Sequence, residues 1–221
     1  MTTDSRVRSG MVVGALALGL LIGVLLGFVL DQGSKPESTP RGPSVVTTGP
    51  TTEENGVPIG YARTEEGAVA AATNFNLLAG KDELLDRDSM VTAMETIAAP
   101  DWKDEATRQA TSGYDYVVDT YGSNADVSAA VVRYQVVDYT NNQASVRLWT
   151  VSLASGSKRS QVEEVWAVVT IDLIWTDNDW RVNGIESSVG PAPVDLPSDQ
   201  SGESATTLME EFDEFRGAPV P

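Results

Sequence analysis

The sequence predicts an α+β domain that one N-terminal transmembrane helix holds at the outer side of a cell membrane. Three observations predict this plan. An apolar run covers residues 10–30, segments with helical spacing of apolar residues follow between 64 and 121, and segments with strand-like alternation follow between 132 and 186. Helices followed by strands are typical of an antiparallel sheet that is covered by helices on one face.

The run at residues 10–30 contains no charged side chain. Its 21 residues would form a helix of about 31 Å, which matches the hydrocarbon core of a bilayer. A cleaved signal peptide is the alternative, but the run exceeds the usual apolar region and no small-residue cleavage site follows it. Arg6 and Arg8 precede the run, so we expect residues 1–9 in the cytoplasm and the rest of the chain outside, in a single-pass arrangement.

Gly19, Gly23 and Gly27 recur every four residues and would lie on one face of the membrane helix. This spacing lets two helices approach closely, which indicates a contact with a second copy or with a partner span. Glycine is also common in membrane helices in general, and that simpler explanation stays open.

Proline-rich stretches divide the remaining chain. Residues 31–57 are rich in Pro, Ser and Thr without an apolar period, which predicts a flexible to semi-extended linker. Residues 58–191 carry regularly spaced apolar residues and form the predicted extracytoplasmic domain. Residues 192–221 return to Pro, Ser, Gly and acidic residues, which predicts a disordered acidic tail.

Three helices are expected at the start of the domain. Thr64 is the predicted N-cap of the first, which should run to about Ala79. The second should begin at Asp88 and end before Pro100, and the third should cover residues 101–121. The helices would therefore precede the whole sheet in the chain.

Four strands are expected after the helices, each with alternating or continuous apolar residues. The first runs from about Val132 to a turn at Asn141-Asn142, and the others cover residues 144–153, 162–175 and 180–186. The short connections predict a four-stranded antiparallel meander with helices on one face.

Two segments carry a resemblance to known families. Leu173-Ile174-Trp175 followed by Asp179-Trp180-Arg181-Val182 resembles the strand, tight turn and strand that close the sheet in the cone-shaped nuclear transport factor 2-like fold. Gly56 to Tyr61 followed by Thr64 to Asn74 resembles a group of uncharacterised actinobacterial single-pass membrane proteins, some associated with conjugative elements. The first resemblance covers residues 62–190 and implies a curved, cone-shaped sheet.

The second resemblance implies a role as well as a plan. Proteins of that group combine an anchor, a proline-rich linker and an outer domain, and they are similar in plan to bitopic scaffold subunits of type IV secretion and conjugation channels. Such subunits use the outer domain for assembly and not for catalysis. The resemblance therefore implies protein partners and contributes no catalytic residue.

The composition excludes much chemistry. The sequence contains no Cys and no His, which removes thiolate nucleophiles, imidazole bases and most transition-metal sites. Residues 58–191 hold 10 basic and 20 acidic residues, so the domain repels nucleic acid phosphates. Asp172 interrupts an apolar strand pattern, and we interpret it as outward facing or paired with an arginine. We expect no enzymatic activity, no cofactor, no metal and no direct nucleic acid contact.

Five other residues are candidates for contacts with a partner or a ligand. Leu208, Phe212 and Phe215 stand at i, i+4 and i+7 among acidic residues, and would form a short amphipathic helix on docking into a partner groove. An inert solubilising tail is the alternative. Trp175 and Trp180 flank the last predicted turn, and either line a pocket or close the end of the sheet against the core.

The leading hypothesis is a non-enzymatic, membrane-anchored scaffold or accessory subunit. Its extracytoplasmic domain would assemble with itself or with envelope proteins in a conjugation-type transfer apparatus. The alternative is an extracytoplasmic binding module that holds a small apolar or peptidic ligand in the cone pocket. An interior filled by the domain's own side chains would argue against that alternative.

Overall fold

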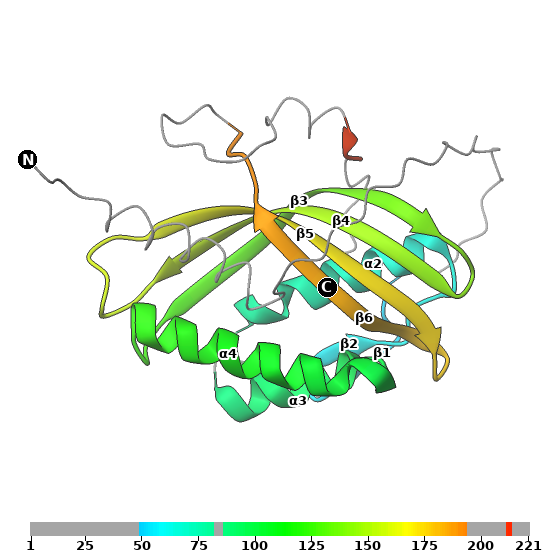
Figure 1. The fold of residues 1–221 in the computed structure, drawn as a ribbon, viewed down its shortest axis with the longest axis horizontal. Coiled ribbons are helices and arrows are strands. Elements are labelled where there is room, and N and C mark those ends of the chain that lie inside the picture. The colour runs from blue at the N-terminus through cyan, green and yellow to red at the C-terminus, as the bar shows by residue number, and fades with distance from the viewer. Residues whose placement is uncertain (1–48, 82–85, 194–210, 214–221) are drawn as a thin grey trace, which may run out of the picture.

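The computed structural model describes residues 49–81, 86–193 and 211–213. Its elements, in chain order, are β1 (Thr52–Glu54), β2 (Val57–Ile59), α2 (Glu65–Asn76), η2 (Leu77–Gly80), α3 (Arg87–Ile97), η4 (Pro100–Trp102), α4 (Lys103–Tyr121), β3 (Asp126–Tyr139), β4 (Gln143–Ser155), β5 (Glu163–Thr176) and β6 (Asp179–Val189). The four long strands form one antiparallel sheet in the order β3-β4-β5-β6. The sheet arches over the helices, which lie on one side of it (Figure 1). The predicted α+β class and antiparallel meander are therefore confirmed.

The domain begins earlier than predicted. A hairpin of β1 and β2 begins at Thr52, before the predicted start at residue 58, and Val57 within it is fully buried in the core. Its turn is Asn55-Gly56, and both residues have positive φ (52° and 76°), as a two-residue hairpin turn requires. The predicted linker boundary at residue 57 is wrong because this turn pair lies among polar residues that resemble a linker in composition.

The helix starts follow side-chain capping. Thr64 caps α2 as predicted, since its Oγ1 accepts a hydrogen bond from the Gly67 amide at 3.1 Å. Helix α3 begins at Arg87, one residue before the predicted Asp88. Its cap is Asp86, whose carboxylate accepts hydrogen bonds from the amides of Asp88 and Ser89. The α-helical part of α2 ends at Asn76, and η2 continues to Gly80.

The strands are longer than the sequence pattern indicates. β3 begins at Asp126, well before the predicted Val132, and its pairing with β4 shifts between Val131 and Arg133 and again between Val136 and Asp138. Such bulges interrupt the period of two on which strand prediction depends. The tight turn between β5 and β6 is confirmed.

The core lies between the helices and the face of the sheet that they cover, called here the inner face. Buried residues of α2, α3, α4 and all four sheet strands form one hydrophobic cluster. Its largest fully buried side chains are Trp180, Tyr121, Phe75, Leu78, Met94, Ile97, Leu148, Ile171, Leu173 and Val57. Because these side chains fill the inside of the cone, the packing argues against a large ligand pocket there.

None of the helices in the described part of the chain has the length and apolar character needed to cross a membrane. The predicted membrane helix at residues 10–30, with Gly19, Gly23 and Gly27, lies outside the described residues. Leu208 and Phe215 of the predicted docking motif lie outside them too.

Candidate interaction surface

The face of the sheet that points away from the helices, called here the outer face, carries an aromatic cluster. Trp149 of β4 is fully buried, and Val168 and Trp166 of β5 pack beside it. The Trp149 and Trp166 ring centroids are 5.2 Å apart. An antiparallel sheet covered by helices on one face commonly presents polar side chains on the other. An aromatic cluster on this face therefore indicates that something covers it.

The chain itself supplies part of the cover. After β6 it turns back over this face, where the Pro191 carbonyl accepts a hydrogen bond from Trp149 Nε1 at 3.0 Å. The Gly190 amide donates to the Trp166 carbonyl at 3.0 Å. The side chain of Phe212 completes the cluster and is only 4% exposed.

Residues 211–213, called here the tail segment, lie along β3 and β4 on the outer side of the sheet (Figure 1, red). The Asp213 amide donates to the Tyr134 carbonyl at 2.6 Å, and the Tyr134 amide donates to the Asp213 carbonyl at 3.1 Å. The tail segment thus adds one bridge to the edge of β3. The prediction of a disordered tail is wrong for these three residues, because an aromatic cluster and a strand edge bind them.

Two arginines of the outer face hold the tail segment. The Arg147 guanidinium lies 5.3 Å from the centroid of the Phe212 ring, and its Nη1 lies 3.9 Å from Oε2 of Glu211. Arg133 donates from Nη1 to the Phe212 carbonyl at 3.4 Å. The surface therefore recognises an aromatic ring, a carboxylate and a backbone carbonyl together.

The tail segment does not cover the whole outer face. Val151 lies opposite Ala130 on β3 and opposite Trp166 on β5, and Leu153 continues the same row. Leu153 is 45% exposed, and Ala130 is exposed as well. An apolar row thus extends from the aromatic cluster to the exposed side chain of Leu153.

The pKa of one carboxyl group reflects the nearness of the tail segment to the first helix. The pKa of Glu65, at the start of α2, is raised by partial burial, by Glu66 and by the nearby Asp213. Docking of the segment therefore brings a carboxylate toward an already acidic helix start. The attachment of the tail segment to the sheet therefore depends on Arg133, Arg147 and the ring of Phe212.

The predicted pair Trp175 and Trp180 closes the end of the sheet. The two rings meet edge to face with centroids 5.3 Å apart, and Trp180 is fully buried in the main core. Trp180 Nε1 donates to the Ala62 carbonyl at 3.0 Å, and the Arg63 guanidinium lies 5.2 Å from the Trp175 ring centroid. Of the two interpretations of this pair, these contacts support the one in which the rings close the end of the sheet against the core.

Asp179 has a role that the sequence does not indicate. Beyond forming the turn, its buried carboxylate accepts hydrogen bonds from the amides of Gly60 at 2.8 Å, Tyr61 at 3.0 Å and Trp180 at 2.9 Å. It also pairs with Arg181 at 3.2 Å. The carboxylate thus ties the segment before α2 to the last hairpin of the sheet.

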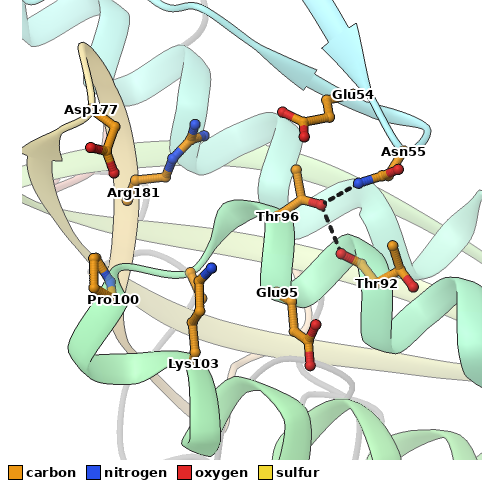
Figure 2. A pocket seen from close by; sticks show the side chains of 10 residues that line it. Glu54, Asn55, Thr92, Glu95, Thr96, Pro100, Lys103, Asp177 and Arg181 are labelled. Atoms are coloured by element: carbon orange, nitrogen blue, oxygen red, sulfur yellow. Dashed lines mark hydrogen bonds between the residues drawn. The ribbon is translucent and has the colours of Figure 1, made fainter.

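A polar pocket of 340 Å³ lies at the same end of the domain (Figure 2). Thr96 there donates to the Thr92 carbonyl at 2.8 Å and accepts from Asn55 at 3.0 Å. The charged lining residues are Glu54, Glu95, Lys103, Asp177 and Arg181. Among the described residues no cluster of acidic side chains could hold a metal ion. This pocket differs from the apolar one that a cone ligand would need.

Asp172 lies on the outer face and is exposed, opposite Gly184 on β6. This position agrees with its interpretation as an outward-facing residue. A carboxylate in contact with solvent lacks the dry surroundings in which proton transfer groups usually work.

The described structure is thus an α+β domain with helices on one face of a four-stranded antiparallel sheet and a partly covered aromatic cluster on the other. Residues 37–204 match the family described as Domain of unknown function (DUF8175), and the chain belongs to this family. No curated protein matches the chain in sequence.

Several solved structures are similar to part of the domain. CagV from Helicobacter pylori, described as a VirB8 homolog of T4SS, is 16% identical, and the match covers 56% of this chain and 98% of that chain with a TM-score of 0.44. The intermembrane space region of chloroplast protein ARC6 is 13% identical over 58% and 95%, with a TM-score of 0.38. A cystatin-like domain from Nostoc punctiforme is 10% identical over 57% and 80%, also with 0.38. These TM-scores are low, so none of the three bears on what this chain does.

Proposed function

We propose that the chain is a non-enzymatic, membrane-anchored scaffold or accessory subunit whose extracytoplasmic domain mediates protein assembly. Residues 10–30 would form its single span, with the N-terminus in the cytoplasm and the domain outside. The resemblance in plan to actinobacterial conjugation-associated proteins and to bitopic scaffold subunits supports a conjugation-type transfer apparatus as its setting.

The aromatic cluster on the outer face, with the apolar row beside it, is the observation that carries this proposal. Trp149, Trp166 and Val168 form a cluster on the face that helices do not cover, and the row continues to the exposed Leu153. Covering the part of this row that is still exposed, such as Leu153, would remove apolar area from water, which favours association. The absence of Cys and His also removes the thiolate nucleophiles and imidazole bases on which many catalytic sites depend.

The packing favours assembly over the binding-module alternative. The side chains that would line a cone pocket pack against one another in the main core, where Leu148 and Ile171 are fully buried. The pocket at the sheet end is lined by charged residues such as Glu95 and Lys103, which suit no apolar ligand.

Site-specific photo-cross-linking in the native cell tests where the domain makes contacts. A photoreactive amino acid at position 153 of the full chain, on the outer face, should give strong adducts of higher mass. The same amino acid at position 112, exposed on α4, should give few. Equal adducts at both positions, or none at position 153, would argue against the outer face as the assembly surface.

A further inference from the structure

We propose that the outer face carries a binding site for an acidic segment with a central phenylalanine on a partner protein, and that the tail segment occupies this site as a tethered competitor. The inference deepens the proposed function, on which it rests for its biological use. It names the chemistry of the partner and a means by which the chain controls access.

The hydrophobic part of the site fits one aromatic ring. Phe212 of the tail segment is only 4% exposed. Its ring packs with Trp149 and Val168, and the partly buried Trp166 packs against the same cluster. A buried aromatic anchor at the centre of a small contact is the usual form of a peptide-binding site.

The charged part of the site selects acidic neighbours. Arg147 contacts both the Phe212 ring and the Glu211 carboxylate, and Arg133 reaches the Phe212 carbonyl. These cations stand out in a domain region that holds 10 basic and 20 acidic residues. A partner segment with a basic residue in place of Glu211 would meet Arg147, so charge complementarity favours an acidic segment.

Within the described residues, the contact has a backbone part and an anchor. Two hydrogen bonds join the backbones of Tyr134 and Asp213, and the ring of Phe212 is the anchor. A tethered segment acts at an effective concentration of about 1 mM, so it occupies even a weak site until a stronger or more abundant ligand displaces it. Displacement of the tail segment would free the Phe212 site beside the Leu153 row, so that a partner could contact both.

A competition experiment tests the inference. The probe is a fluorescent synthetic peptide with the sequence of residues 206–216, and fluorescence anisotropy measures its binding to the full chain in detergent. Phe212→Ala in the chain should tighten binding about tenfold, because it removes a tethered competitor. Ser112→Ala, a substitution at an exposed position of α4 on the other side of the sheet, should leave the weak binding of the unmodified chain unchanged.

Two further variants locate the site. Arg147→Glu added to Phe212→Ala should abolish the gain, and a peptide with alanine at the position of Phe212 should not bind either variant. If Phe212→Ala bound the peptide no more tightly than the unmodified chain, or if Arg147→Glu had no effect, the inference would be wrong. Peptide binding needs neither a cell nor a partner, so its failure is distinguishable from a failure of cross-linking at position 153.

Discussion

Replacing Asp179 by alanine is expected to lower the free energy of unfolding by about 3–5 kcal/mol. The buried carboxylate accepts hydrogen bonds from the amides of Gly60, Tyr61 and Trp180 and pairs with Arg181. Alanine would leave buried donors without an acceptor, and each such group costs about 1–3 kcal/mol. The loss should separate the segment before α2 from the end of the sheet.

Urea unfolding of the full chain in detergent, followed by tryptophan fluorescence, measures this effect. Asp172→Ala is the matched control, because Asp172 is a carboxylate of the same sheet that is exposed to solvent. The control should stay within about 0.5 kcal/mol of the unmodified chain. A similarly small change for Asp179→Ala would show that the carboxylate has no such structural role.

Replacing Gly67 by alanine is expected to destabilise the domain, although alanine favours a helix over glycine by about 1 kcal/mol. A Cβ at this position would lie 2.0 Å from the Ala62 carbonyl oxygen and 2.9 Å from its carbon. Relief would move the start of α2, whose cap is the hydrogen bond from the Gly67 amide to Thr64. Overpacking costs about 1–3 kcal/mol, and partial loss of the cap costs about 1 kcal/mol. Together these costs exceed the gain in helix propensity.

Thermal unfolding followed by circular dichroism checks the prediction for Gly67. Gly184→Ala serves as the control, since a Cβ there would meet Asp172 at 3.4 Å and 3.7 Å, which is ordinary contact. We expect Gly67→Ala to lower the midpoint and Gly184→Ala to leave it nearly unchanged. An increase for Gly67→Ala would mean that helix propensity outweighs the close approach.

Local sequence signals predicted the elements that depend on local physics. The cap at Thr64 and the stop at Pro100 set helix boundaries within a few residues. Met90, Met94 and Ile97, which are spaced at i, i+4 and i+7, are buried on one face of α3. The hairpin at Asn55-Gly56 was missed because its strands are three residues each, β1 is polar and β2 contains a proline. Short strands carry too few alternations to distinguish them from a linker.

The candidate surface depends on features that no local pattern contains. Trp149 and Val168 become neighbours through the register of β4 and β5, and Arg133 joins them only because a bulge changes the side to which the following residues of β3 point. Phe212 was predicted as a docking residue from its spacing and its acidic neighbours. Its place on the chain's own sheet follows from a tertiary contact that the sequence does not indicate.

The size of the complex formed by the full chain tests the central claim most directly. After mild detergent extraction from native membranes, the unmodified chain should migrate on size exclusion as an assembly larger than the monomer. Leu153→Glu, which places a charge in the exposed apolar row, should reduce that assembly to the monomer without changing the thermal midpoint. An unmodified chain that is already monomeric, or a variant whose assembly is unchanged, would contradict assembly through the outer face.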